Sequence, residues 1–233
     1  MISIIIPTLN EESALENTLR GILQLHSEAL LEIIVADGGS DDRTVSIASR
    51  YAMVVCSAKG KAIQLNTGAL AARGDILFFV HADLWLPEGT IRRVDEWINE
   101  LGYDGGGFSN VFSSHNQRIK LLGRMFHLEF RNREDDVRNT LFFGDNGIFV
   151  RKTVFDLLGG FKLLPIMEDF DFSKRLSDRF RVARILEPKL VASPRRQLKA
   201  GFVKTHLQWL LIKRLFLWGV PAPILAKWYA DVR

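Results

Sequence analysis

The N-terminal half of the chain alternates short apolar runs with stretches whose apolar residues recur at helical spacing. The run Ile2–Ile6, which Pro7 ends, is typical of a strand buried on both faces. In Glu11–Leu25 the apolar residues fall on one face of a helix. The same alternation predicts strands over Glu32–Ala36, Met53–Cys56 and Asp75–Val80, and helices over Asp41–Tyr51 and Gly60–Arg73. Strands separated by helices indicate a parallel sheet with right-handed crossovers.

The second half is less regular, and its sequence contains neither an internal repeat nor a low-complexity linker. We interpret Gly105-Gly106-Gly107 as a hinge or a point of close approach within one domain. The pattern predicts strands over Gly107–Phe112, Gly147–Val150 and Arg181–Ile185, and helices over Gln117–Phe130, Glu168–Ser177 and Gly201–Leu217. We therefore expect a single α/β domain over residues 1–200, followed by an amphipathic helical extension over residues 201–233.

Composition narrows the class of protein. Of the 233 residues, 47% are hydrophobic and 25% are charged, which are globular values that exclude intrinsic disorder. The single cysteine, Cys56, excludes an intrachain disulfide and a multi-cysteine zinc site, and we expect it in the core. Residues 1–110 carry 8 Lys and Arg against 15 Asp and Glu, whereas residues 111–233 carry 23 against 12. A basic half beside an acidic half indicates a partner that bears phosphates, such as a nucleotide, a nucleic acid or an anionic lipid.

Targeting signals are absent from the sequence pattern. The N-terminus has no basic region, and no apolar stretch reaches the roughly 20 residues that span a bilayer. Between Pro188 and Ala230 there are eight Lys and Arg and no acid, with tryptophans interleaved. This mixture suits an anionic membrane surface over residues 201–230, but it equally suits a helix packed on the domain or on a second subunit. We expect a cytoplasmic protein, peripheral on the inner face of the plasma membrane.

Polar residues follow several of the predicted strands at their carboxyl ends, where ligands bind in parallel sheets. Pro7, Thr8, Asn10 and Glu11 suit hydrogen bonding to a base or ribose, although Thr-x-x-Glu is also a helix cap. Asp37, followed by two glycines, can accept hydrogen bonds from a nucleoside or can form a tight turn.

Three further groups carry charge. Lys61 lies at a helix start, where an amine and the helix dipole attract phosphate, unless the turn is merely solvated. His81 and Asp83 lie on the same side of an extended segment, and can hold a divalent ion or form a structural pair. Arg195 and Arg196 suit bidentate contact with a diphosphate, or form a solvated loop.

Adjacent acids at a predicted helix start are candidates for proton transfer. Glu168 and Asp169 can supply a general base if one of them reaches the proton that it takes. The alternative is that the helix dipole favours acids in the first turn.

The order of these groups is more specific than any one of them. The chain contains, in sequence, SIIIPTLNEE, IIVADGGSDDRT, KGKAIQLNTGA, GDILFFVHAD, GDNGIFVRKTVFDLLGGF and MEDFDFSKRL. This series resembles a family 2 glycosyltransferase with the GT-A fold, a mostly parallel Rossmann-like sheet flanked by helices. The form HAD and the late SPRR resemble most the small bacterial branch that is associated with radical-SAM and selenodomain proteins.

The resemblance implies an inverting transfer from a nucleotide diphosphate sugar, with a UDP-sugar favoured, to an acceptor hydroxyl. Residues 1–105 are then the nucleotide-binding half and residues 106–200 the acceptor half. The residues implied to contact the nucleotide are Pro7, Thr8, Asn10, Glu11, Asp37, Lys61, Asn66, Arg195 and Arg196. Those implied on the acceptor side are Gly144, Asp145 and Asn146. Asp169 is the implied general base, with Glu168 beside it.

Asp83 corresponds to the last acid of the family's Asp-x-Asp motif, which holds the metal bound to the diphosphate. His81 replaces the first acid, and histidine can ligate Mn²⁺, whereas Mg²⁺ prefers oxygen. We expect a divalent cofactor, Mn²⁺ or Mg²⁺. The alternatives are a nucleotidyltransferase, or a non-catalytic partner protein that binds nucleotide sugars. The basic residues match no nucleic-acid-binding module, so no nucleic-acid partner is predicted. A homodimer is compatible with the C-terminal segment.

Overall fold

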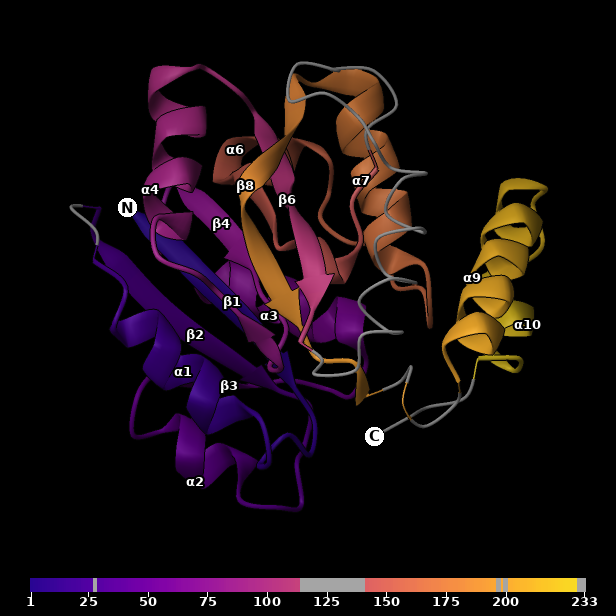
Figure 1. The fold of residues 1–233 in the computed structure, drawn as a ribbon, viewed down its shortest axis with the longest axis horizontal. Helices are drawn as coiled ribbons and strands as arrows, with labels where there is room; N and C mark the ends of the chain where they lie inside the picture. The colour runs from indigo at the N-terminus through magenta and orange to yellow at the C-terminus, as the bar shows by residue number, and fades with distance from the viewer. Residues whose placement is uncertain (27–28, 114–140, 196–197, 199–200, 230–233) are drawn as a thin grey trace.

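The computed structural model describes residues 1–26, 29–113, 141–195, 198 and 201–229 (Figure 1). The predicted helix Gln117–Phe130 and the candidate Arg196 lie outside the described residues. The described chain forms a central sheet flanked by helices, with a helical hairpin beside it.

The N-terminal half forms the parallel part of the sheet. Its strands are β1 (Ile2–Thr8), β2 (Leu31–Asp37), β3 (Met53–Cys56) and β4 (Ile76–Phe79), which lie in the order β3-β2-β1-β4. The strand register pairs Thr8 with Asp37, so β1 and β2 end side by side. The four strands confirm the predicted parallel arrangement and bring the loops that follow them to one edge of the sheet.

The second half adds mixed strands. The whole sheet runs β3-β2-β1-β4-β7-β6-β8-β5, with β7 (Ile148–Arg151) antiparallel to both of its neighbours. Strand β6 (Gly105–Phe112) is parallel to β8 (Val182–Ala192), and β5 (Leu84–Trp85) pairs antiparallel with the end of β8. Strand β8 thus continues to Ala192, beyond the end that apolar patterning predicted at Ile185.

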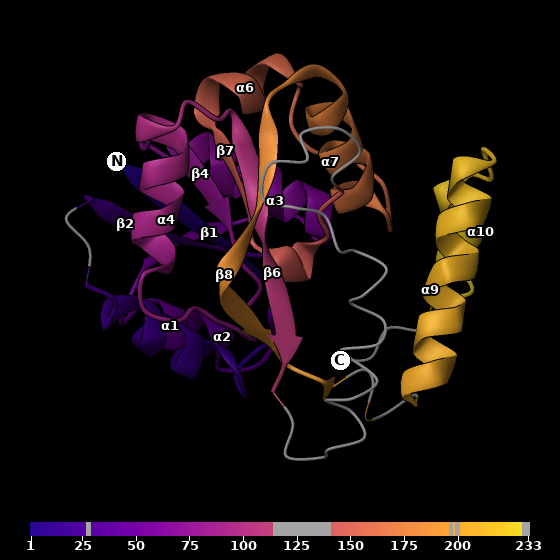
Figure 2. The same cartoon turned by 45° about the horizontal axis from the view of Figure 1, so that its top comes forward.

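Alternate side chains of each strand enter different cores on the two faces of the sheet. Ile4 and Ile6 pack on one face and Ile5 packs on the other. The first face is covered by α1 (Leu15–Leu23), α2 (Thr44–Ala48), α4 (Thr90–Asp95) and the π-helical turn Glu96–Glu100. The second is covered by α3 (Lys61–Ala71), α6 (Lys152–Leu157) and α7 (Glu168–Arg179) (Figure 2).

The first two helices are shorter than predicted because their leading residues bond to each other across two loops. The backbone N–H of Asn10 donates to Ser40 Oγ at 2.9 Å, and Asp41 N–H donates to Asn10 Oδ1 at 2.9 Å. Glu11 N–H donates to Thr44 Oγ1 at 2.8 Å. The helix-capping interpretation of residues 8–11 is therefore wrong, since these groups join the β1 loop to the β2 loop. The placement of Cys56 in the core is also wrong, because it is exposed.

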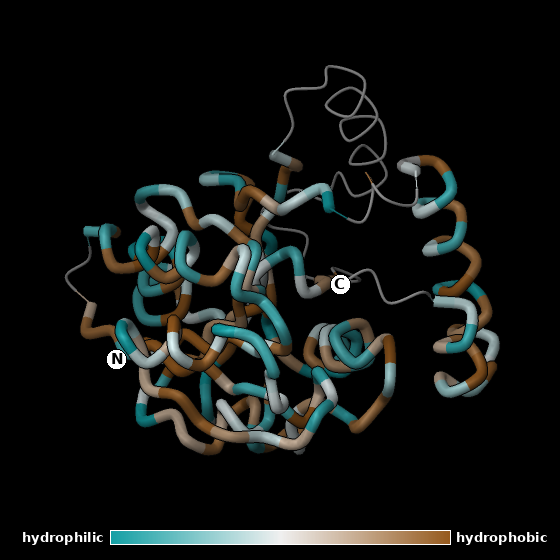
Figure 3. The backbone as a smooth tube through the Cα atoms, turned by 90° about the horizontal axis from the view of Figure 1, so that it is seen from below, coloured by the Kyte–Doolittle hydropathy of each residue, from teal (hydrophilic) through white to brown (hydrophobic). Residues whose placement is uncertain are grey.

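The C-terminal hairpin consists of α9 (Phe202–Leu217) and α10 (Ala222–Ala226), and it stands beside α7 (Figures 1 and 2). Two aromatic pairs join α9 to the domain, with ring centroids 4.8 Å apart for Phe143 and Trp209 and 5.9 Å apart for Phe170 and Phe216. Apolar and polar residues alternate along the hairpin (Figure 3). Within the described residues, no helix has the length and apolar content needed to cross a membrane.

The glycines of β6 allow close approach. A Cβ atom at Gly106 would lie 2.3 Å from the carbonyl oxygen of Ala183, and one at Gly107 would lie 2.5 Å from Phe142 Cδ1. A side chain at Gly106 would force β6 away from β8, and one at Gly107 would collide with the ring of Phe142. Of the two interpretations of the triple glycine, the structure supports close approach.

We expect Gly106→Ala to destabilise the protein by about 1–3 kcal/mol, because overpacking a filled core displaces backbone. Ser109→Ala on the same strand is the matched control and should change the free energy of unfolding by less than about 0.5 kcal/mol. Urea unfolding followed by circular dichroism measures both. Equal stability of the two variants would contradict the close-packing interpretation.

Candidate functional site

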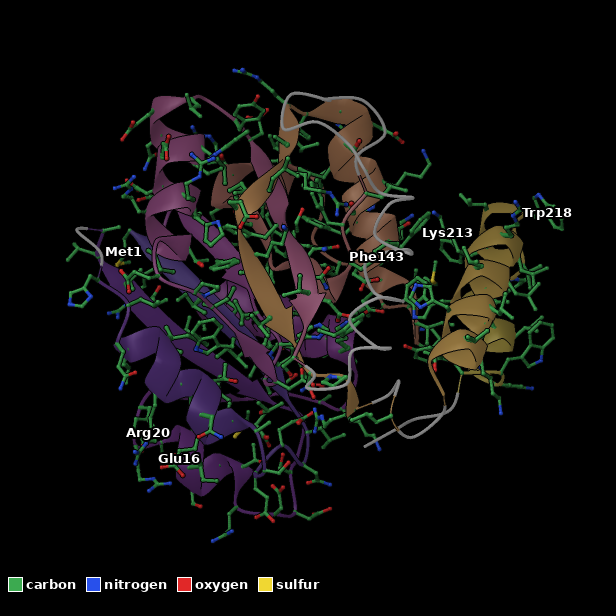
Figure 4. The ribbon with its side chains drawn as sticks, viewed as in Figure 1. Met1, Glu16, Arg20, Phe143, Lys213 and Trp218 are labelled. Atoms are coloured by element: carbon green, nitrogen blue, oxygen red, sulfur yellow. The ribbon has the colours of Figure 1, made fainter. Side chains whose placement is uncertain are left out.

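A cavity of about 680 Å³ lies at the carboxyl ends of the parallel strands, between the sheet and the hairpin. Most of the residues singled out from the sequence line it, namely Pro7, Thr8, Glu11, Lys61, His81, Asp83, Gly144, Asp145, Asn146, Glu168, Asp169 and Arg195. Asn10, Asp37 and Asn66 are not among its lining residues. Phe143, which also lines the cavity, lies between the domain and α9 (Figure 4).

Asp37 organises the loop that follows β2. Its carboxylate is buried and accepts hydrogen bonds from Thr8 Oγ1 at 3.0 Å, from Gly39 N–H at 3.0 Å, and from the N–H and hydroxyl of Ser40. An ionised carboxylate has about four acceptor sites, so these contacts saturate it. Asp37 thus forms a tight turn at the end of β2, and its contact with a nucleoside stays a prediction.

Asn66 holds a different loop in place. Its amide nitrogen donates to the carbonyl of Phe161 at 2.8 Å, and its oxygen accepts the Phe161 N–H at 2.9 Å. This reciprocal pair fixes the segment that follows α6 against α3. Asn66 is not among the residues that line the cavity, and its place beside the nucleotide stays a prediction.

Arg195 joins two of the strand-end loops. Its guanidinium donates to Asp83 Oδ2 at 2.9 and 3.2 Å and to Glu11 Oε2 at 2.9 Å. Burial lowers the pKa of Arg195, but the charges of Asp83 and Glu11 outweigh this and raise it above its ordinary value. One permanent cation thus sits between two acids that are distant in sequence, at the edge of the cavity.

The turn Gly144–Asn146 connects the other motifs. Gly144 N–H donates to Asp169 Oδ2 at 2.8 Å, and Asp145 Oδ1 lies 3.5 Å from His81 Nδ1. Asn146 is buried and donates to the carbonyl of Phe108 at 2.9 Å, which ties the turn to β6. A Cβ atom at Gly144 would lie 2.1 Å from His81 Nε2, so only glycine allows this close packing.

Glu168 and Asp169 begin α7 and are both buried, with 4% and 8% of their surfaces exposed. Lys61 Nζ lies 2.9 Å from Glu168 Oε1 and 3.7 Å from Asp169 Oδ2. The second oxygen of Asp169 accepts the N–H of Phe170 at 2.7 Å. Met167, just before them, has a φ of 66°, a left-handed conformation that is uncommon for a non-glycine residue and often occurs at functional sites.

Burial and neighbouring charges shift the pKa values of Lys61 and Glu168. Burial lowers the pKa of the Lys61 ammonium, but the charges of Glu168 and Asp169 outweigh it and raise that pKa. Burial raises the pKa of the Glu168 carboxyl, the charge of Lys61 opposes the rise, and the charge of Asp169 adds to it. Lys61 therefore stays charged at neutral pH and faces the acid pair, and its contact with the nucleotide stays a prediction.

Sequence reasoning missed several residues of the cavity. Gln64 donates from its buried amide to the carbonyls of Thr8 and Ala36, at 2.6 and 3.1 Å, and so joins the ends of β1 and β2. Arg184 lines the cavity from β8, and burial lowers its pKa to about 10. An arginine inside the apolar run VARIL was a signal that could have identified it. Trp209 lines the cavity, where it packs on Phe143 of the domain, which is one of the two alternatives that the sequence left open.

The side chains of His81 and Asp83 fit a metal ion only if a bound diphosphate completes its coordination. The described residues contain no group of three or more His, Cys, Asp or Glu that could hold an ion. Asp83 is bonded to Arg195, and His81 lies beside Asp145. If they exchanged these partners for a metal ion, Asp83 and His81 would supply two ligands from one loop. A bound diphosphate would have to supply the others.

Solved structures share this fold. A mannosyltransferase from Pyrobaculum calidifontis, in complex with GDP-Man and Mn²⁺, matches with a TM-score of 0.71 and 23% identity, over 97% of this chain and 68% of that one. Residues 1–349 of S. aureus TarS, in complex with UDP-GlcNAc, match with a TM-score of 0.67 and 18% identity, over 82% and 58% of the two chains. The fold is therefore the GT-A fold of glycosyltransferases.

The chain belongs to glycosyl transferase family 2, because the model of that family matches residues 3–159. The probable glycosyltransferase YdaM of Bacillus subtilis is 33% identical over 198 residues, covering 75% of this chain and 46% of YdaM. Glycosyltransferase AglD of Haloferax volcanii is 30% identical over 115 residues, covering 44% and 18%. The chain thus spans less than half the length of these curated relatives.

The raised pKa of Glu168 makes a prediction about stability. A buried acid whose pKa is raised contributes stability that is full below its ordinary value of 4.5 and is lost as pH rises through the raised value. Because a neutral amide avoids this loss, we expect Glu168→Gln to raise the Tm at pH 8. At pH 4 the advantage should disappear. Thermal unfolding at both pH values measures it.

The exposed Glu100 provides a matched control, and Glu100→Gln should leave the Tm unchanged at either pH. A Tm at pH 8 that is lower for Glu168→Gln than for the parent would show instead that the ion pair with Lys61 outweighs the burial of the carboxylate.

Proposed function

We propose that the protein transfers a sugar, with inversion, from a nucleotide diphosphate sugar to an acceptor hydroxyl. The observation that carries this proposal is that two charged groups line one cavity. Asp169, with Lys61 and Glu168, forms the first group, and Arg195, with Asp83 and Glu11, forms the second. The first group suits proton removal, and the second suits a diphosphate.

The donor occupies the strand-end side of the cavity. Pro7, Thr8 and Glu11 contribute the wall for the nucleoside, and Arg195 reaches the diphosphate by exchanging a carboxylate for phosphate oxygens, which suit the same planar donors. A divalent ion held by Asp83 and His81 would add positive charge to the leaving diphosphate. A UDP-sugar is our preferred donor; the similar structures named above hold UDP-GlcNAc and GDP-Man.

Transfer begins when the acceptor hydroxyl oxygen attacks the anomeric carbon on the face opposite the diphosphate. The new carbon–oxygen bond forms as the bond to the diphosphate breaks, and the nucleoside diphosphate leaves with that electron pair. Asp169 takes the hydroxyl proton. The hydrogen bonds from the N–H groups of Gly144 and Phe170 fix the orientation of its carboxylate. The positive charge of Lys61 offsets the negative charge of Glu168 and Asp169.

We also propose that the outer face of the hairpin binds an anionic membrane surface. Large apolar side chains are exposed there, with 59% of Leu207, 52% of Leu211 and 77% of Trp218 accessible. Trp218 extends from the far end of α9 (Figure 4). Lys204, Arg214 and Lys227 lie among them, and the described hairpin has no acid. Exposed apolar groups with one sign of charge complement an anionic lipid surface.

Asp169→Asn should keep donor binding and lower the transfer rate by about 10²–10⁴-fold, because the amide cannot accept the proton. The release of nucleoside diphosphate from a UDP-sugar or GDP-sugar, with slow hydrolysis included, measures the rate. Asp178→Asn on the exposed end of α7 is the control and should transfer at the parent rate.

Transfer by Asp169→Asn at the parent rate would show that Asp169 is not the base. Pyrophosphate in place of nucleoside diphosphate would favour a nucleotidyltransferase. An absence of turnover in the parent protein, with donor bound, would favour a non-catalytic partner protein.

Sedimentation with vesicles tests the membrane proposal. We expect the protein to bind phosphatidylserine-containing vesicles more strongly than phosphatidylcholine vesicles, and binding should weaken with salt. The triple variant Lys204→Gln, Arg214→Gln and Lys227→Gln should lose this difference, since each basic residue near the surface contributes about 1 kcal/mol. Failure of the parent to bind either vesicle would leave packing or dimerisation as the role of this face.

A further inference from the structure

The cavity has two walls of different chemistry. On the strand-end wall lie the charged groups described above. The opposite wall consists of side chains from the hairpin, including Trp209, Leu210, Ile212, Ala226 and Tyr229. The apolar surface of this second wall faces the space that the catalytic acids also line.

The apolar wall continues into the segment that carries the acids. Pro165, Ile166 and Met167, which directly precede Glu168, line the same cavity. Met167 packs with Ile212 and Leu225 of the hairpin in one buried cluster. An acceptor that presents a hydroxyl to Asp169 therefore lies against apolar side chains next to its reacting end.

A fully polar acceptor fits this wall poorly. Thr205, His206 and Lys213 also line the cavity from α9, but hydroxyls that face Leu210 and Ile212 would lose their hydrogen bonds to water without replacement. A molecule with a polar head and an apolar chain fits both walls, because each buried methylene contributes about 0.8 kcal/mol.

We propose that this wall is the subsite for the apolar chain of an amphipathic, lipid-borne acceptor. The proposal rests on the proposed glycosyl transfer and adds the class of the acceptor. The head of the acceptor reaches Asp169, and its chain lies along the inner face of α9 towards α10.

The position of the subsite relative to the exposed face supports a lipid source. Ile212 lines both the cavity and a second, outer groove, which it shares with Leu207, Leu211 and Trp228. One helix thus separates the apolar wall of the cavity from the face that we propose to bind membranes. Lys213 lies on the cavity side, where it adds a cation near the chain and head.

The length of the bound chain provides the test. Hexyl, octyl and decyl β-D-glucopyranoside, each below its micelle-forming concentration, are titrated into the protein that contains bound nucleoside diphosphate. Complete burial tightens binding by about fourfold per methylene. We expect at least a twofold gain per methylene.

Two neighbouring leucines supply matched variants. Leu210 lines the cavity, whereas Leu211 lines only the outer groove. Leu210→Gln should abolish the dependence of glucoside affinity on chain length but keep vesicle binding. Leu211→Gln should keep the dependence on chain length but lose vesicle binding. Ala226→Gln, which changes the same wall from α10, replaces Leu210→Gln if that variant does not fold.

Affinity that is independent of chain length would overturn the proposal, as would no binding of any glucoside. A length dependence that only Leu211→Gln removes would place the chain in the outer groove and overturn it too. The affinity for nucleoside diphosphate is measured on the same samples. Because the nucleotide binds only at the strand-end wall, normal nucleotide affinity without glucoside binding would overturn the lipid subsite alone, whereas loss of nucleotide binding would overturn the proposed function.

Discussion

The site depends on the balance of charge at one edge of the sheet. Parallel strands bring their carboxyl ends together, and the loops that follow carry acids from positions far apart in the chain. Such acids repel one another in a partly buried cavity unless cations lie between them. Arg195 separates Glu11 and Asp83, and Lys61 faces Glu168 and Asp169. These two cations join residues from both halves of the chain into one cavity.

The same balance links structure to the proposed chemistry. A diphosphate brings negative charge, so Arg195 can move from carboxylate to phosphate without losing its charge-assisted hydrogen bonds. Lys61 is held more firmly, since it contacts a buried acid pair. One cation therefore suits ligand exchange and the other suits orientation of the base. The sequence could not distinguish these roles, because both residues are simply basic and both lie near strand ends or helix starts.

The parallel half of the fold could be predicted because its strands are continuous apolar runs and its helices have one apolar face. The shortened starts of α1 and α2 could not, since the hydrogen bonds between Asn10, Ser40 and Asp41 join residues about thirty positions apart. The order of the motifs identified most of the residues that line the cavity. It could not show which motif residues form hydrogen bonds outside the cavity. Asp37 forms hydrogen bonds within its own loop, and Asn66 forms hydrogen bonds with Phe161, 95 positions away. The sequence also could not show which side chains of the C-terminal segment face the cavity and which face solvent. Trp209 lines the cavity, whereas Trp218 is exposed.

Calorimetric titration with UDP and with GDP, each with and without Mn²⁺, tests the central claim that this edge of the sheet is a nucleotide diphosphate site. The account predicts that one nucleotide binds, that Mn²⁺ strengthens its binding, and that Asp83→Ala loses the effect of the metal. Binding of neither nucleotide, under any of these conditions, would contradict it.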